Sequence, residues 1–493
     1  MLSIDEIKQF ITDDLSDERK QYAKIGQRYY EAEHDILKTR MFYFNDSEEL
    51  IEDVYRSNIK ISHPFFTELS DQLASYMLSF EENPIRAKEK VDGLQKHLDQ
   101  YFGKKFWAEI YELINGSYTK GFEYIYGFKG SKNRMEFQCA DSLGVIEVRE
   151  KDTDDGCKYI IYYYVDRIEK GHKKITRIEV WSEENICYYV MSDNGDVEID
   201  KSKKDNPRPH VIYKDEKTGE RLGSPLGYIP FWRMDNNRKR ISGLKPIKGI
   251  IDDYDLHACS LSNNLKDFDT PIHFVSGFEG DNLDKLQLNL KTKKLVGVGE
   301  GGGVEVATVD IPYQARKEKL EIDEKNIYKF GMGLNTSGLK DTNATTNIAI
   351  KMAYTLLDLK SDKVQIQLEA VLEELVEVVL AEINQENETD FTLDDVEFKF
   401  TRCVTTNETE NIANEKVKAE TEQIKVNTIL NIAANVGDEK TLEAICEVMD
   451  WDFEELQSQI EKIKEEQNLL EAKNALNNVV PEDEPIIDEP VIE

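Results

Sequence analysis

The chain is poor in cysteine and histidine and has no long apolar run. Its 493 residues include six cysteines, which lie far apart and form neither a CxxC pair nor a cysteine–histidine group at zinc spacing. We therefore expect reduced thiols in a reducing compartment, with no disulfide framework and no zinc site. The cysteines are Cys139, Cys157, Cys187, Cys259, Cys403 and Cys446. No apolar run approaches the roughly 18 residues of a membrane-spanning helix, and the first residues lack the basic start and apolar core of a signal peptide.

Positive charge is scarce as well. The chain has 63 Lys and Arg against 97 Asp and Glu, a formal net charge of −34, and a pI near 4.7. A surface that grips nucleic acid needs clustered Lys and Arg, so the composition excludes general nucleic-acid binding. It equally disfavours docking on an anionic membrane. Hydrophobic residues make up 40% of the chain, which is enough for real cores, and the length suggests about three domains.

Motifs of known catalysis are also missing. The glycine cluster at residues 297–303 is followed by strand-like sequence, not by the helix of a phosphate-binding loop, and no Lys-Ser or Lys-Thr accompanies it. The cluster predicts a hairpin tip. Neither GxSxG nor a catalytic cysteine signature occurs. We expect no enzymatic activity, no metal and no cofactor.

Histidines and clustered acids receive a structural interpretation. No two of the histidines form HExxH or an acid-spaced pair, so we expect each to be structural or solvated. They are His34, His63, His97, His172, His210, His257 and His273. Asp252, Asp253 and Asp255 are close together on a predicted helix, where successive side chains diverge by about 100°. They predict a solvated acidic face and not a metal site.

The first half of the chain predicts helices followed by hairpins. Ser3 and Glu6 resemble a capping box that opens a first helix, and a second helix is expected from Asp17 to Tyr30. Helical apolar periodicity returns between residues 63 and 120 and stops at Gly121. From residue 122 to 213, alternating runs separated by turn clusters predict an antiparallel meander. Helices followed by hairpins indicate an α+β class.

The second half alternates helices with a small insert. We expect a helix over residues 246–268, a β-rich insert, a charged helix over 313–330, a polar stretch over 334–346 and a long helix over 347–384 that bends near residues 362–363. A strand over 394–404, helices over 407–434 and 439–471, and an acidic tail follow. Helices with such thin apolar faces need neighbours, which a ring of identical subunits would supply.

Several ordered stretches resemble the portal proteins of long-tailed phages of Gram-positive hosts. Tyr29–Ile36 is similar to the family pattern YYxGxHxI, with Ala32 where glycine is common. Further similar stretches are residues 58–61 and 83–85, 327–330 with 347–351, and 398–402 with 407–408. The family usually has a proline near position 405, where this chain has Thr405.

The resemblance implies a portal-type subunit. Residues 1–245 would form an α/β wing, 246–268 and 313–331 the two stem helices, and 269–312 a small β-rich clip. Residues 332–346 would be a tunnel loop, 347–405 a long kinked helix with a return strand, 406–478 an α-helical crown and 479–493 a disordered acidic tail.

The resemblance also implies sites and partners. The loop residues expected to meet DNA are Asn335, Thr336, Ser337, Lys340 and Asn343, and the clip residues expected to dock partners are Gly299, Gly301, Gly302 and Gly303. Such proteins form a ring, typically of twelve, at one capsid vertex of the virion, and are assembled in the host bacterial cytoplasm. The ring passes double-stranded DNA during packaging and ejection. Its expected partners are the terminase large subunit, the head–tail adaptor, and the major capsid and scaffolding proteins, with no membrane.

Two alternative interpretations remain at this stage. The first is another virion protein, such as a head–tail connector or a minor head protein. The second is an intracellular hydrolase or nuclease that uses scattered carboxylates, although no paired motif supports it.

Overall fold

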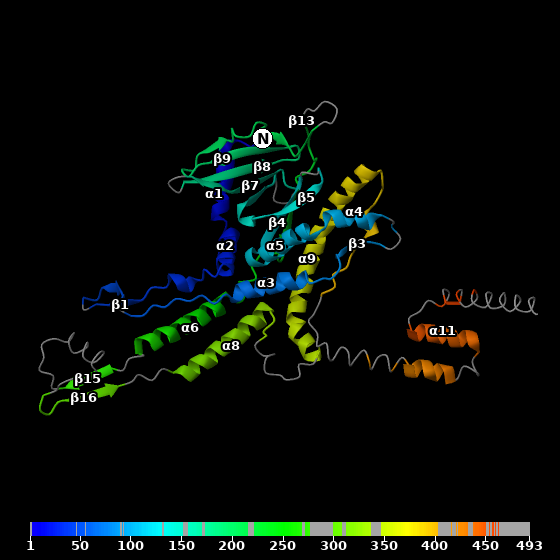
Figure 1. Ribbon diagram of the computed structural model, residues 1–493. Helices are drawn as coiled ribbons and strands as arrows, with labels where there is room; N and C mark the ends of the chain where they lie inside the picture. The colour runs from blue at the N-terminus through cyan, green and yellow to red at the C-terminus, as the bar shows by residue number, and fades with distance from the viewer. Residues whose placement is uncertain are drawn as a thin grey trace, which may run out of the picture. The chain divides into compact units, whose positions relative to one another are not determined.

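The computed structural model describes most of the chain (Figure 1). The described residues are 2–45, 47–54, 56–88, 91, 93–130, 133–150, 156–169, 173–214, 221–268, 272–276, 299–307, 312–336 and 347–402, with further positions between 416 and 462. The chain divides into two compact units. The larger comprises residues 1–344 and 348–404, and the smaller comprises residues 345–347 and 405–493. Helices and strands both contribute to the larger unit, which confirms a mixed helix and strand fold. None of the described helices is long and apolar enough to span a membrane.

The N-terminal helices begin as the sequence predicts. Helix α1 (Ile4–Ser16) opens with the capping box of Ser3 and Glu6, and α2 (Glu18–Tyr30) opens with Asp17, whose side chain accepts the N–H of Arg19. Both caps satisfy N–H groups that a helix start leaves without a partner. Ile7 and Ile11 of α1 are buried against a sheet.

Three further helices build the main core. They are α3 (Phe65–Met77), α4 (Leu94–Tyr101) and α5 (Lys104–Lys120). Helix α5 ends at Gly121, whose φ of 97° is left-handed and favours glycine. The largest apolar cluster joins α3, α4 and α5 to strands and to the last long helix of the unit.

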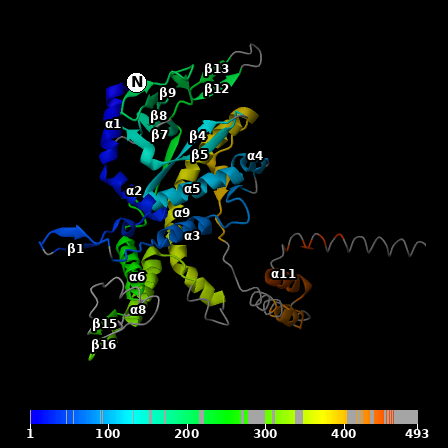
Figure 2. The same ribbon diagram turned by 60° about the vertical axis from the view of Figure 1, so that its left-hand side comes forward.

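The strands form two main sheets rather than the single meander that the sequence predicts. One sheet has the order β14-β4-β5, with β4 (Phe122–Lys129), β5 (Met135–Ala140) and β14 (Phe231–Asp235). The other is an antiparallel meander of β6 (Val145–Val148), β7 (Tyr159–Glu169), β8 (Lys173–Trp181), β9 (Asn185–Met191) and β10 (Val197–Ile199), and β11 (Arg208–Pro209) also pairs with β9. A hairpin of β12 (Val211–Lys214) and β13 (Arg221–Ser224) follows. Helix α1 packs on the meander (Figure 2).

A helix pair carries the predicted insert. Helix α6 (Lys248–Phe268) leads to β15 (Ile272–Ser276), which pairs with β16 (Gly303–Ala307), and α8 (Tyr313–Gly331) returns beside α6 (Figure 1). The Lys319 ammonium joins the two helices because it contacts carboxylates of Asp253 (2.5 Å) and Asp323 (2.5 Å).

Helix α9 (Asn347–Asn387) is 41 residues long and passes residues 362–363 without interruption. Its second half is buried along Leu368, Leu372 and Leu375. The apolar stripe that the sequence predicts for the first half is exposed instead: Met352 is 73% and Leu359 50% exposed. The strand predicted over 394–404 is shorter, with β17 (Val396–Phe398) paired to β3 (Ile85–Ala87). In the smaller unit, α11 spans Asp438–Met449.

A small hairpin leaves the body between α2 and α3. A 3-10 turn (Asp35–Lys38) precedes β1 (Phe42–Phe44), which pairs with β2 (Leu50–Glu52). An extended segment, residues 57–63, then returns to α3. We call residues 41–54 the arm and residues 57–63 the strap.

Candidate functional site

The polar loop between α8 and α9 starts from a tightly packed root, residues 331–334. Helix α8 ends as Met332 turns left-handed (φ 53°) and the Gly333 N–H donates to the Tyr328 carbonyl at 2.9 Å. A Cβ added at Gly331 would lie 2.6 Å from Leu69 Cδ1, and one at Gly333 would overlap Cδ2 of the same leucine. A larger residue at either position would require the Leu69 side chain to move, so the two glycines let the root pack directly on Leu69 of α3.

Gln72 of α3 holds the next residue by its backbone. Its Oε1 accepts the Leu334 N–H at 3.0 Å, and its Nε2 donates to the Leu334 carbonyl at 3.0 Å. The side-chain amide thus forms the two hydrogen bonds that a neighbouring β-strand would otherwise provide. It satisfies both backbone groups of Leu334, which lies in an irregular segment. The Leu334 side chain is buried against Tyr76 and Leu357.

Lys360 ties the middle of α9 to the same root. Its side chain is buried, and Nζ donates to the carbonyls of Gly331 (3.1 Å) and Leu69 (3.4 Å). Nζ also lies 3.9 Å from the centre of the Tyr118 ring, a cation–π contact. Burial lowers the pKa of Lys360 to about 7, because removal from water disfavours the charged form.

The same part of α9 is held from a second side. The Tyr76 hydroxyl donates to the Asp358 carboxylate, and Arg402 contacts Asp362 at 2.7 Å and also the amide oxygen of Gln365. Burial, followed by the hydrogen bond to Asp358, raises the pKa of Tyr76. Helix α3, helix α9 and the segment after β17 are therefore fixed to one another around the loop root.

The structure describes part of the predicted loop site. Asn335 and Thr336 follow the root directly, and Thr336 is exposed. Ser337, Lys340 and Asn343 lie outside the described residues. Sequence reasoning missed Gln72 and Lys360, the two side chains that hold the root.

The predicted clip glycines form the turn before β16. The Gly302 N–H donates to the Gly299 carbonyl at 2.9 Å, and Gly301 has a φ of 82°. Gly303 opens β16 opposite Ser276, whose Oγ accepts the Gly303 N–H at 3.1 Å. The residues before this turn, 295–298, lie outside the described part, and the described partner of β16 is β15, so the predicted hairpin tip stays a prediction.

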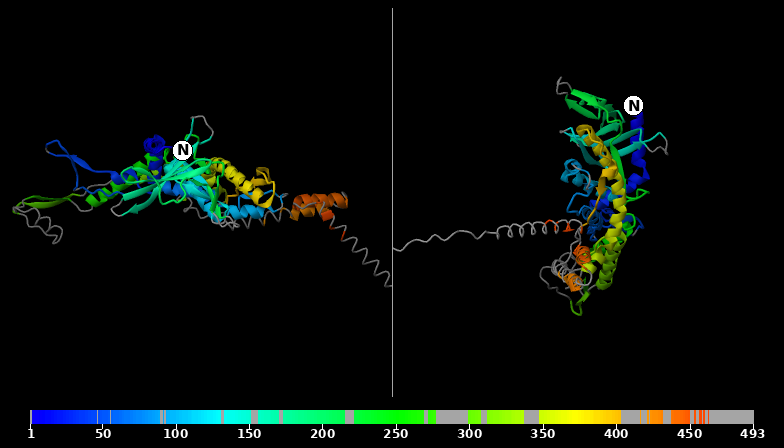
Figure 3. Two further views of the ribbon diagram at one scale, coloured as in Figure 1. Left: turned by 90° about the horizontal axis from the view of Figure 1, so that it is seen from above. Right: turned by 90° about the vertical axis from the view of Figure 1, so that its right-hand side faces the viewer.

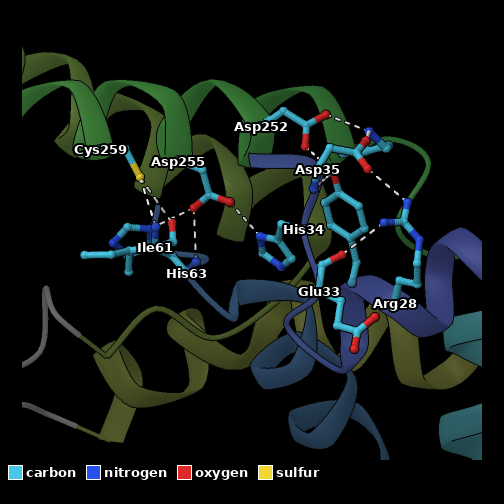
Figure 4. A network of polar contacts seen from close by, with 11 residues as sticks. Arg28, Glu33, His34, Asp35, Ile61, His63, Asp252, Asp255 and Cys259 are labelled. Carbon is cyan, nitrogen blue, oxygen red and sulfur yellow. Dashed lines mark hydrogen bonds and ion pairs between the residues drawn. The ribbon is translucent and has the colours of Figure 1, made fainter. Parts of the chain in front are cut away.

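Of the three α6 acids predicted to form a solvated face, Asp252 and Asp253 are partly exposed, but Asp255 is not solvated. Asp255 is fully buried, and its two oxygens meet Nδ1 of His34 (2.6 Å) and Nδ1 of His63 (2.7 Å) (Figure 4). Burial raises the pKa of Asp255, but the hydrogen bonds from both histidines outweigh it and hold the pKa below its usual value. One carboxylate thus joins three separate segments of the chain.

Asp255 is also the first rung of a ladder between α6 and the strap. Side chains at every fourth position of the helix accept N–H groups at every second position of the strap. The pairs are Asp255 with His63 (3.0 Å), Cys259 with Ile61 (3.2 Å), Asn263 with Ile59 (2.6 Å), and Asp267 with Ser57 (3.2 Å). Four helical residues rise about 6.0 Å and two extended residues about 6.6 Å, so the two repeats stay in step.

The contacts of the ladder bind the strap to α6. Burial raises the pKa of the Cys259 thiol, which keeps it protonated and a poor nucleophile. Among the described residues, no group of three or more His, Cys, Asp or Glu side chains could hold a metal ion.

The fold thus combines an α6–α8 pair that carries a small β insert, a fixed loop root and a 41-residue helix. Residues 9–470 match the family model described as "Phage portal protein, SPP1 Gp6-like", and the chain therefore belongs to this family of phage portal proteins. This favours the portal interpretation over the two alternatives.

Two relatives carry the name portal protein. That of Bacillus phage SPP1 is 25% identical over 348 residues, which cover 70% of this chain and 67% of the relative. That of Clostridium phage phiCD119 is 25% identical over 402 residues, covering 77% and 82%. A chain in the structure titled "Neck of native GTA particle computed with C12 symmetry" aligns with a TM-score of 0.39 and 11% identity over 78% of this chain and 89% of that one.

Proposed function

We propose that this chain is the subunit of a closed ring, with twelve the expected number, at one capsid vertex of a tailed phage. The ring conducts double-stranded DNA inward during packaging and outward during ejection, and it has no enzymatic activity of its own. Family membership supports this function. The exposed apolar stripe of α9 and the exposed arm support assembly, because such surfaces normally mark interaction sites.

The proposed subdomains follow the sequence boundaries. Residues 1–245 are assigned to the wing, α6 and α8 to the stem, residues 269–312 to the clip, and 406–478 to the crown. The glycine turn before β16 lies at the far end of the stem pair, where the terminase large subunit and later the head–tail adaptor would dock. Other proposed partners are the major capsid and scaffolding proteins.

The observation that carries the proposal is the fixed root of the polar loop. Leu69, Gln72 and Lys360 hold residues 331–334, and the following polar stretch contains a single cation, Lys340. A loop with a fixed base would present the same few polar groups from every subunit to DNA in the channel. Each phosphate contact adds affinity, so a ring that must let DNA slide benefits from few cations and an acidic wall.

Packaging with loop variants tests the proposal. We expect wild-type protein to form rings visible by negative-stain electron microscopy. Lys340→Glu and deletion of residues 338–342 should keep the ring and reduce nuclease-protected DNA in a packaging assay. Lys239→Glu, at an exposed site on another loop, is the matched control and should package normally. A monomeric wild type would overturn the ring, whereas normal packaging by Lys340→Glu would overturn only the loop assignment.

A further inference from the structure

The arm exposes apolar side chains on both of its faces. All six residues paired in β1 and β2 are exposed, which is unusual for strands so rich in aromatic and aliphatic residues. Five of the six are apolar, with exposed fractions of 51% for Phe42, 43% for Tyr43, 71% for Phe44, 59% for Leu50 and 40% for Ile51, and Val54, just after β2, is 76% exposed. The arm projects clear of α6 and of the β15–β16 hairpin (Figure 1, Figure 2 and the left panel of Figure 3).

The arm is nevertheless a preformed hairpin. The Asn45 side chain accepts the N–H groups of Ser47 (3.0 Å) and Glu49 (2.8 Å) and donates to the Glu49 carboxylate (3.0 Å). The Asn45 N–H also donates to the Glu49 carbonyl at 3.0 Å. An isolated two-stranded hairpin is marginally stable in water at best, so turn chemistry alone does not account for this element.

The arm is mounted firmly at both of its ends. Its C-terminal side continues into the strap, which the ladder binds along α6. Its N-terminal side follows Asp35, whose carboxylate meets Lys248 at 2.7 Å and Arg28 at 2.9 Å. The arm is thus anchored to α6 through the segments on both sides of it. A partner that binds the tip of the arm would therefore be fixed relative to that helix.

The exposed area suits a protein–protein contact. With about 150–250 Å² for a large side chain, these fractions leave on the order of 600 Å² of apolar surface. A standard interface uses about 800 Å² per partner. Burial of apolar surface favours such a contact, and this gain must exceed the entropy that association costs. The acidic residues Glu48, Glu49, Glu52 and Asp53 on the arm disfavour an anionic membrane or nucleic acid as the occupant.

We infer that the arm docks on a second copy of this chain and clamps neighbouring subunits together. The inference rests on the proposed ring. In a closed ring each subunit gives one surface and receives a different one, so each arm would cover an apolar surface of the next subunit and contribute to every interface. The buried contact would also supply the third layer that the two-stranded hairpin lacks.

Charge placed on the arm tests the inference. Phe44→Asp and Leu50→Asp should each convert rings to monomers, as measured by light scattering. The monomers should remain folded, because neither side chain packs in the subunit core. Ile168→Asp is the matched control, since Ile168 is an apolar strand residue that is 64% exposed and lies outside the arm. It should leave the ring intact. Rings formed by both arm variants would overturn the inference while leaving the proposed function standing.

Photo-cross-linking identifies the occupant. With p-benzoylphenylalanine at position 44, ultraviolet light should give a product of twice the 57.0 kDa chain mass, with the attachment point on another copy. The same probe at position 168 should give less of it. Attachment within the same chain, to lipid, or to a different virion protein would overturn the inference. If the arm variants and the control variant all lose the ring, the cross-linked site decides whether the inference holds: attachment to another copy supports it, and any other attachment overturns it. A wild type without rings would instead overturn the proposed function.

Discussion

At the scale of single residues, Lys360 is the most informative position. It is the one buried lysine of α9, and among the described residues its ammonium meets two backbone carbonyls and the ring of Tyr118 rather than a carboxylate. A buried cation without a carboxylate partner normally costs stability unless function or specificity retains it. Its place beneath the loop root suggests that it sets the position of α9 relative to Gly331.

Replacing Lys360 by Met should remove a pH-dependent term from stability. The pKa of Lys360 is about 7 in the folded chain and near 10.5 when unfolded, so between these values the unfolded state binds more protons. Stability therefore rises with pH across this window, by up to about 1.4 kcal/mol per unit. Urea unfolding at pH 7, 8 and 9 should show a steeper rise for wild type than for Lys360→Met. Parallel slopes would contradict the assignment.

Gln72 offers a second test at this scale. Gln72→Ala leaves the buried N–H and carbonyl of Leu334 without their partner, which we expect to cost about 1–3 kcal/mol. Gln72→Glu keeps an acceptor for the N–H, but it places a carboxylate oxygen against the Leu334 carbonyl and the Glu68 carboxylate, both of which accept from Nε2 in the wild type, so its loss should be at least as large. Hydrogen exchange in residues 328–336 should therefore accelerate in both variants. Equal exchange in all three proteins would show that Gln72 does not hold the root.

At the scale of elements, helix starts and the α6–insert–α8 order could be predicted from sequence because capping and periodicity are local signals. Burial was harder. The first half of α9 carries two stripes: Met352, Leu356 and Leu359, which are exposed, and Leu357 and Val364, which are buried. Periodicity favours the first stripe because Lys360 interrupts the second. A lysine buried by tertiary contacts is a case that local pattern cannot identify.

The α6 side of the ladder had a signal in the sequence, which the prediction of a solvated acidic face did not use. Asp255, Cys259, Asn263 and Asp267 recur at every fourth position, which places four hydrogen-bond acceptors on one face of a helix. What the sequence could not supply is the partner, because the strap is about 200 residues away and reaches α6 only through the fold. The same distance hid the convergence of His34 and His63 on Asp255.

The ladder predicts a local loss when one rung is removed. Asn263→Ala leaves the Ile59 N–H without its acceptor, and we expect a loss of about 1–3 kcal/mol. Hydrogen exchange should accelerate in residues 57–63 and little elsewhere. Asp253→Ala is the control on the same helix: its ion pair with Lys319 is partly exposed, so about 0–1 kcal/mol is expected. Equal protection of the strap in both variants would show that the rung does not matter.

At the scale of the whole molecule, the net charge of −34 per chain bears on how a ring of these subunits would interact with DNA in its channel. A closed ring of such subunits should repel DNA over most of its surface and contact it only at a few loop groups. We therefore expect no retention of double-stranded DNA fragments by purified rings at about 0.15 M salt. The exposed residue Thr336 next to the loop root gives a direct way to alter this balance.

Thr336→Lys should make rings retain DNA and slow its passage. Each subunit would add one phosphate contact, and affinity from several contacts falls steeply as salt rises. The variant should bind fragments in a mobility-shift assay at about 0.05 M salt and release them at about 0.2 M. Thr336→Gln, which adds length without charge, should behave like wild type. Retention of DNA by wild-type rings at the higher salt, or salt-independent binding by Thr336→Lys, would contradict the weak-contact channel, because either result requires a grip that the charge of the ring opposes.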